Sequence, residues 1–170
     1  MSFQNQFTKT TTDANLMETV HHGSAEYPFR YYYENIALFD FKCIDWHWHS
    51  ELEFIYIESG NVVFDIGTVH FELNEGNGIM INSKILHRLQ SSSDAIIPNF
   101  LFQPSFIAPQ DSLIYKKYIN PVISSSLEYL VFQPDIPWQK KALEIIKTII
   151  AVQETEFNRE IIVSMSVQQL

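Results

Sequence analysis

The chain has 170 residues, 46% of them hydrophobic, and a formal net charge of −9. This length and hydrophobic content predict one folded domain with its own core and exclude a disordered chain. Only 11 residues are lysine or arginine and they are scattered, which argues against direct binding of a DNA backbone by this segment. The single cysteine, Cys43, excludes an internal disulfide and fits a reducing compartment.

The first part of the chain shows neither an export signal nor a membrane span. Residues 1–26 are interpreted as a flexible N-terminal arm, because they begin with a polar run and lack a basic region followed by an apolar one. No apolar run reaches the roughly 20 residues that a membrane span needs, so we expect a cytoplasmic protein. Within the arm, His21 and His22 are interpreted as a solvated turn, since no third metal-binding group lies nearby.

Residues 27–132 have the pattern of many short β-strands separated by turns. The expected strands cover residues 29–33, 36–44, 52–57, 62–66, 69–73, 79–82, 87–90, 99–102 and 127–132. Strands 62–66 and 69–73 are separated by Gly67 and Thr68, which predicts a tight hairpin. The even spacing predicts a mainly β fold, an antiparallel jelly-roll barrel with a pocket at its mouth.

Residues 133–170 have a helical pattern. Asp135 is a plausible N-cap, and Pro137 suits the first turn of a helix. The helix would present an apolar stripe of Leu143, Ile146, Ile149 and Ile150. A second helix is expected to begin near Asn158. The barrel is therefore expected to be followed by two C-terminal α-helices.

Residues 46–60 carry the side chains that point to chemistry. His47 and His49 are one residue apart, so both imidazoles project from the same face of an extended strand. Glu53 returns to that face if the strand stays regular, and His87 follows a later turn. Three imidazoles and a carboxylate form a plausible set of ligands for a divalent transition metal such as zinc or nickel.

Two other interpretations of these residues remain open. Glu53 interrupts an apolar strand, and a carboxylate in such a place is costly unless it is paired or protonated. It would then lie at the mouth of the barrel, in contact with water or an arginine. Alternatively, the histidines hydrogen-bond to each other and to Glu53 around water, with no metal.

The same residues resemble known families. His47, His49, Glu53 and Gly60 match the first motif of the cupin family of small β-barrels, and His87 matches the histidine of its second motif. The flanking residues resemble more narrowly the sensory domain of AraC-type transcription regulators: Trp46-His47-Trp48-His49, Glu51-Leu52-Glu53, Ile81-Asn82-Ser83 and Leu86-His87. Metal-binding cupin enzymes usually carry proline and glycine where this chain has Asn82 and Lys84. This difference favours the regulator over an enzyme.

The resemblance implies an N-terminal cupin-like sensory and dimerisation domain. A small-molecule effector or an ion would bind in the barrel, the C-terminal helices would form a homodimer, and DNA would be contacted only by a C-terminal half absent from these 170 residues. The expected ligand-binding residues are His47, His49, Glu53, His87, Trp46, Trp48 and Tyr56. Strand alternation means that the tryptophans cannot all share the histidine face. The alternative function is a metal-dependent cupin enzyme, either a dioxygenase or an isomerase.

Overall fold

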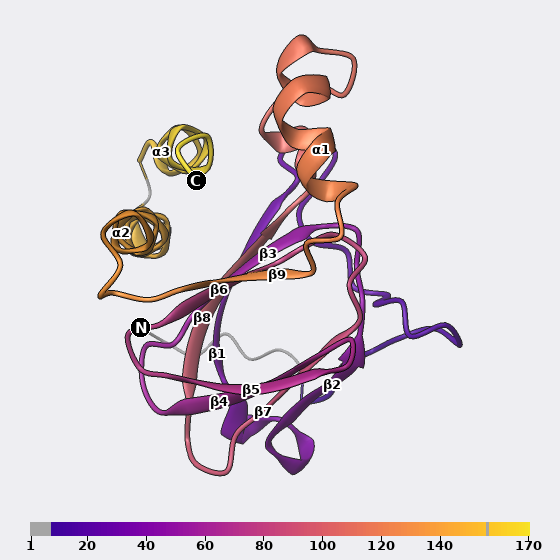
Figure 1. Cartoon of the computed structure of the whole chain (residues 1–170), viewed down its shortest axis with the longest axis vertical. Helices are drawn as coiled ribbons and strands as arrows, with labels where there is room; N and C mark the ends of the chain where they lie inside the picture. Colours follow the sequence, from indigo (N-terminus) through magenta and orange to yellow (C-terminus); the bar gives the residue numbers. More distant parts are fainter. Residues whose placement is uncertain (1–7, 156) are drawn as a thin grey trace.

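The computed structural model describes residues 8–155 and 157–170, which form a mainly β fold followed by helices (Figure 1). The strands are β1 (Phe29–Asn35), β2 (Cys43–His47), β3 (Leu52–Tyr56), β4 (Asn61–Ile66), β5 (Val69–Asn74), β6 (Gly78–Ile81), β7 (His87–Gln90), β8 (Ile96–Phe102) and β9 (Tyr129–Phe132). The helices are a π-helix (Tyr115–Ile119) that continues into α1 (Asn120–Ile123), then α2 (Pro137–Ala151) and α3 (Arg159–Val167). The first seven residues of the expected arm lie outside the described part.

The strands form two antiparallel sheets that face each other (Figure 1). The larger sheet has the order β1-β8-β3-β6-β9, and the smaller sheet has the order β2-β7-β4-β5. Strands that are distant in the sequence are therefore neighbours, as in a jelly roll. The predicted cupin-type barrel with two C-terminal α-helices is confirmed, whereas the domain boundaries at residues 27 and 132 stay a prediction.

Two details of the predicted strands have different outcomes. The hairpin across Gly67 is confirmed, because Ile66 pairs with Val69 at its tip. The single strand predicted over residues 36–44 is wrong, because two 3-10 turns precede β2. Phe41 lies in the left-handed region with φ 59° and exposes 99% of its side chain, so it can neither extend the strand nor join the core.

Strand β3 is apolar on both faces because each face packs against a different layer. Ile55 points into the barrel and is fully buried between the sheets, where it packs with the aliphatic side chains of the smaller sheet. Phe54 points outward into a second core beneath the helices, and its ring stacks on Phe100 with a centroid distance of 5.3 Å. A strand buried on both faces has no solvent-exposed polar face, and this explains why its residues other than Glu53 are aliphatic or aromatic.

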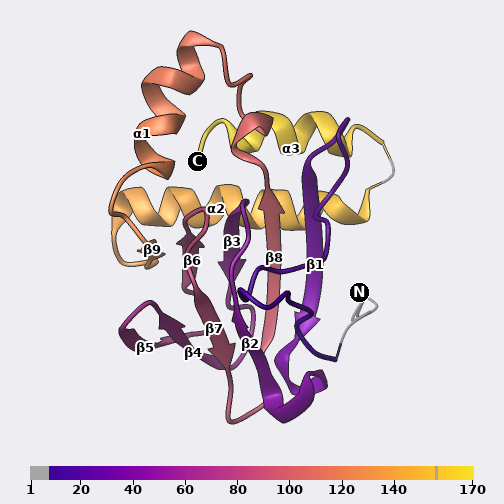
Figure 2. The ribbon, with the colours of Figure 1, turned by 90° about the vertical axis from the view of Figure 1, so that its right-hand side faces the viewer.

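Helix α2 crosses the outer face of the larger sheet, and α3 packs beside α2 (Figure 2). The predicted stripe of α2 faces the sheet, with Ile146 and Ile149 fully buried. Asp135 is not the N-cap of this helix: Ile136 takes that position, without a side-chain capping bond. None of the described helices is both long and apolar enough to cross a membrane.

The packing of α2 on the sheet predicts a large effect of Ile146→Ala. Ile146 is fully buried in the outer core, so the substitution should lower the free energy of unfolding by about 2–5 kcal/mol. Chemical denaturation measures the free energy of unfolding of this variant. The control is Lys140→Ala, which removes an exposed side chain of the same helix. Equal losses in the two variants would contradict the described packing.

Candidate functional site

Four polar side chains meet inside the barrel from different elements. His47 ends β2 and His87 begins β7, and the two residues are paired across the smaller sheet. His49 follows β2 in the connection to β3, and Glu53 projects from β3, the central strand of the larger sheet. Their residues expose only 0–7% of their surface. The site thus forms where the two sheets face each other.

The distances place these groups in contact. The ligand nitrogens of His47, His49 and His87 all lie within 4.8 Å of one another. Glu53 Oε2 lies 3.3 Å from His49 Nε2 and 3.2 Å from His87 Nε2. The convergence expected from the sequence is therefore present, and the acid at its centre contacts histidines and not an arginine.

Backbone carbonyl groups orient two of the imidazoles. His47 Nδ1 donates a hydrogen bond of 2.7 Å to the carbonyl oxygen of Asp45, and His87 Nδ1 donates one of 2.9 Å to that of Ile85. In a neutral ring the Nε2 atom then carries a lone pair. His87 Nε2 is buried without a hydrogen-bond partner among the described residues. This Nε2 atom lies 3.2 Å from Glu53 Oε2. A lone pair that faces a carboxylate oxygen at 3.2 Å is unfavourable unless a proton or a cation lies between the two atoms.

The electrostatic environment favours neutral His47 and ionised Glu53. Burial, and then the neighbouring His87, hold the pKa of His47 well below its usual value. Burial alone would raise the pKa of Glu53, but His49 and His87 outweigh it and hold that pKa well below the usual range. Neutral imidazole and ionised carboxylate are the forms that bind metal ions. The three histidines could therefore hold a metal ion, with Glu53 beside it.

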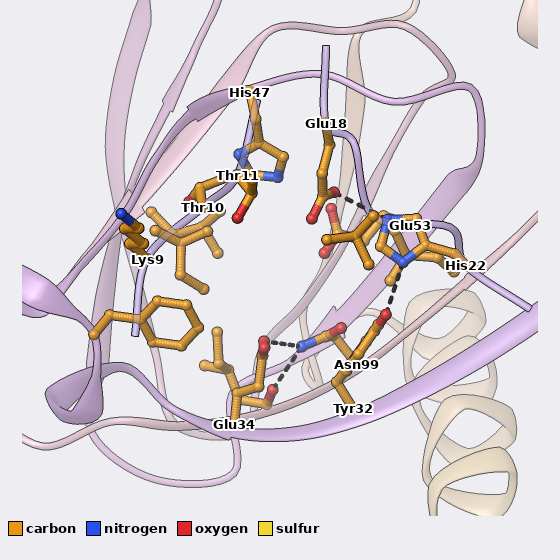
Figure 3. Close-up of a pocket in the computed structure, with 16 residues that line it drawn as sticks. Lys9, Thr10, Thr11, Glu18, His22, Tyr32, Glu34, His47, Glu53 and Asn99 are labelled. Atoms are coloured by element: carbon orange, nitrogen blue, oxygen red, sulfur yellow. Dashed lines mark hydrogen bonds and ion pairs between the residues drawn. The ribbon is translucent and has the colours of Figure 1, made fainter. Parts of the chain in front are cut away.

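A cavity of about 50 Å³ lies next to this cluster (Figure 3). His47 and Glu53 form part of its wall, and apolar side chains such as Ile44 and Leu89 form another part. The N-terminal arm also lines it, through Lys9, Thr10, Thr11, Glu18, Val20 and His22. By volume the cavity holds about four water molecules.

A second polar group lines the same cavity (Figure 3), and its His22 ring packs edge-to-face on His49 with a centroid distance of 5.7 Å. His22 Nε2 lies 2.9 Å from Glu18 Oε2, and its Nδ1 lies 2.9 Å from the hydroxyl of Tyr32. Asn99 Nδ2 donates a hydrogen bond of 2.8 Å to Glu34 Oε2. Burial is the main cause that raises the pKa of Glu34 to about 7, and the nearby carboxylates of Glu53 and Glu18 add to it.

These residues were missed by reasoning from the sequence. The interpretation of His22 as part of a solvated turn is wrong, because it is buried and only 7% exposed. Glu34 follows Tyr32 by two residues on β1, so the two side chains share the inward face. That alternation is the available signal, but it does not say which face of the strand points into the barrel.

Three of the predicted ligand-binding residues lie away from the cavity. Trp46 packs under Arg88, with the guanidinium carbon 5.5 Å from the ring centroid. Trp48 Nε1 donates a hydrogen bond to the carbonyl of Asn15 in the arm. Tyr56 lies in the outer core, where Lys147 of α2 covers its ring. None of the three is among the residues that line the cavity, and their role in binding stays a prediction.

Comparison with known proteins gives the following similarities. The sequence model of the AraC-like ligand binding domain matches residues 38–111. The chain is 32% identical over 140 residues to YdeC, an uncharacterised HTH-type transcriptional regulator of Bacillus subtilis strain 168. This match covers 81% of the chain and 47% of YdeC, so the chain spans about half the length of that relative.

Two solved structures illustrate the weaker similarities. A cupin 2 conserved barrel domain protein from Salinispora arenicola has a TM-score of 0.41 and 14% identity, covering 50% of this chain and 67% of that one. An oxalate decarboxylase from Bacillus subtilis, described with Mn(II) centres, has a TM-score of 0.34 and 21% identity, covering 36% of this chain and 18% of that one. With such low scores, nothing about function follows from either.

The raised pKa of Glu34 predicts the pH dependence of the Glu34→Gln variant. Because the folded state holds this proton up to about pH 7 and the unfolded state releases it near 4.5, the wild type should lose stability as the pH rises through this window. The isosteric amide does not titrate, so the variant avoids a loss of up to about 3 kcal/mol in the free energy of unfolding. Denaturation at several pH values measures the difference in unfolding free energy between variant and wild type, which should grow from pH 5 to pH 8. A difference that is independent of pH would contradict the buried carboxyl.

Proposed function

We propose that the chain is the effector-sensing and dimerisation domain of an AraC-type transcription regulator, because residues 38–111 match the sequence model of the AraC-like ligand binding domain. Residues 1–26 would form its arm, residues 27–132 its ligand-binding barrel and residues 133–170 its dimerisation segment. The observation that carries the proposal is a cavity inside the barrel, lined by buried polar side chains from both sheets and from the arm. Small-molecule sites combine apolar walls with a few converging polar groups in this way, and the volume of about 50 Å³ limits the part of a ligand held here to a few non-hydrogen atoms.

A divalent transition metal, zinc or nickel, is the proposed cofactor of the site. His47, His49 and His87 would supply nitrogen ligands and Glu53 an oxygen ligand. Two features support the fit: Nε2 of His47 and His87 is directed by backbone hydrogen bonds on Nδ1, and the buried Nε2 of His87 lacks a hydrogen-bond partner among the described residues. When bound, the ion would supply a positive centre that attracts an oxygen atom of the effector.

The proposed partners are a second copy of the chain and DNA. Trp138, Ile161 and Met165 on α2 and α3 expose 54–60% of their surface, which supports a homodimer through these helices. DNA would be contacted by a part of the protein outside these 170 residues, as the net charge of −9 here disfavours a phosphate-binding face. Binding of the effector would change which arrangement of the dimer is populated, in the cytoplasm of the cell.

One observation favours the alternative function, a metal-dependent cupin dioxygenase or isomerase. Three buried histidines converge beside the cavity, which His47 lines, and a metal held there with an open position could act on a substrate. Metal analysis combined with a turnover screen separates the two functions. A metal-loaded protein that turns over a substrate supports the enzyme and contradicts the regulator as the sole function.

The regulator proposal predicts that the full-length protein binds a specific DNA sequence. Selection from a random DNA pool should enrich one sequence motif, arranged as two half-sites if the protein is a dimer. The affinity for that motif is then measured with the wild type and with His47→Ala, which alters the cavity wall without touching the outer helices. A full-length protein that enriches no motif would sink the proposal.

The metal proposal predicts that His47→Ala and His87→Ala each weaken zinc binding by at least about tenfold, because each removes one nitrogen ligand. Isothermal titration of EDTA-treated protein with zinc measures the affinity. His21→Ala, which removes an exposed imidazole of the arm, is the matched control and should bind zinc like the wild type. If both cavity variants retain the wild-type zinc affinity, the metal site is elsewhere or absent.

A further inference from the structure

Three carboxylates line the cavity, and they differ in how their charges are compensated. Glu53 is held between His49 and His87. Glu18 pairs with His22. Burial lowers the pKa of His22, but Glu18, with the carboxylates of Glu51 and Glu53, outweighs burial and raises that pKa above its usual value. Glu34 is the third, and it faces the same space. The first two therefore have partners that can carry a positive charge.

Glu34 has no such partner in the described part of the chain. Its hydrogen-bond donor is the side-chain amide of Asn99, which is neutral and also donates to the carbonyl of Ile97 at 3.1 Å. No lysine or arginine among residues 8–155 and 157–170 forms an ion pair with Glu34. Of the described residues that line the cavity, Lys9 is the one lysine or arginine, and it forms no ion pair with this carboxylate.

An uncompensated carboxylate in an enclosed site is costly, because an ion that leaves bulk water must regain its solvation from other groups. The raised pKa of Glu34 is the expected consequence of this cost. The cost falls when a cation enters the cavity and donates hydrogen bonds to the carboxylate. Anionic ligands are disfavoured, because Glu18 and Glu53 line the same space.

We propose that the effector is a small organic cation whose ammonium group pairs with Glu34 beside Asn99, while its alkyl part packs on the apolar wall. This inference rests on the proposed function, since it names the ligand class of the same cavity. Phe39, Ile44 and Leu89 supply the apolar wall. The cavity volume of about 50 Å³ limits the enclosed part of the ligand to about three to five non-hydrogen atoms.

Figure 3 shows Glu34 and Asn99 on the opposite side of the cavity from His47, whereas Glu53, the proposed oxygen ligand, lies nearer to Asn99. Strands β1 and β8 carry Glu34 and Asn99, whereas β2 carries His47. The ammonium subsite can therefore be tested in metal-free protein. Failure to bind an ammonium group and failure to bind a metal ion are therefore separate results.

The test uses three probes of similar size and different charge: propylammonium chloride, propan-1-ol and sodium propionate. EDTA-treated protein is titrated with each at about pH 8, above the pKa of about 7 of Glu34, at constant ionic strength set with sodium chloride. Affinity is obtained from the dependence of the melting temperature on probe concentration. We expect propylammonium to bind about ten- to a hundredfold more tightly than propan-1-ol, as a charge-assisted hydrogen bond predicts.

Glu34→Gln should abolish this preference, because the amide keeps the shape and the bond to Asn99 but loses the charge. The melting curve of the same sample reports whether the variant is folded. Glu144→Gln removes one exposed carboxylate from α2 and should retain the preference.

Three outcomes would overturn the inference. The first is that propan-1-ol or propionate binds at least as tightly as propylammonium, which would mean that the cavity binds a ligand of another chemical class. Glu34→Gln could retain the preference, which would place the cation elsewhere. The third outcome is that no probe binds. In that case no ammonium subsite exists, and the DNA selection with the full-length protein still tests the proposed function separately.

Discussion

The charge of Glu53 is the constraint on which the site depends. This carboxylate projects from the central strand of the larger sheet into a space closed to bulk water, where an unpaired ion would be strongly destabilising. Its compensation comes from His49 and His87, which reach it from outside its own sheet. The two sheets are thus held together at this point by a polar contact, and His87, like its neighbour His47, takes a fixed orientation because its Nδ1 also donates a hydrogen bond to a backbone carbonyl.

The cavity has two chemically different sides as a result. On one side, imidazoles and an ionised carboxylate offer ligands for a metal ion. On the other, Glu34 offers a carboxylate that accepts a hydrogen bond from the neutral amide of Asn99. A ligand that spans both sides would be selected by its charge distribution more than by its apolar area, because both sides are rich in charge and the enclosed volume is small.

Strand β3 connects this cavity to the helices. Glu53 faces the barrel, and the next residue, Phe54, faces the outer core that α2 and α3 complete. A change in the environment of Glu53 is therefore one residue away from the surface on which α2 packs. If the chain senses an effector and dimerises as proposed, β3 would be the element shared by the effector site and the dimer contact.

The sequence by itself determined the elements and the chemistry of one cluster. Alternation and turn residues predicted most strands, helical spacing predicted α2, and the even spacing of His47, His49 and Glu53 predicted a shared face, because these are local patterns. Only the tertiary structure decided the rest. It brought His87 to that face, formed 3-10 turns at Ile36–Leu38 and Asp40–Lys42, buried His22, and placed Glu34 in the wall of the cavity. Which face of a strand points inward, and which distant strands become neighbours, depends on closure of the whole barrel, and no local pattern records that.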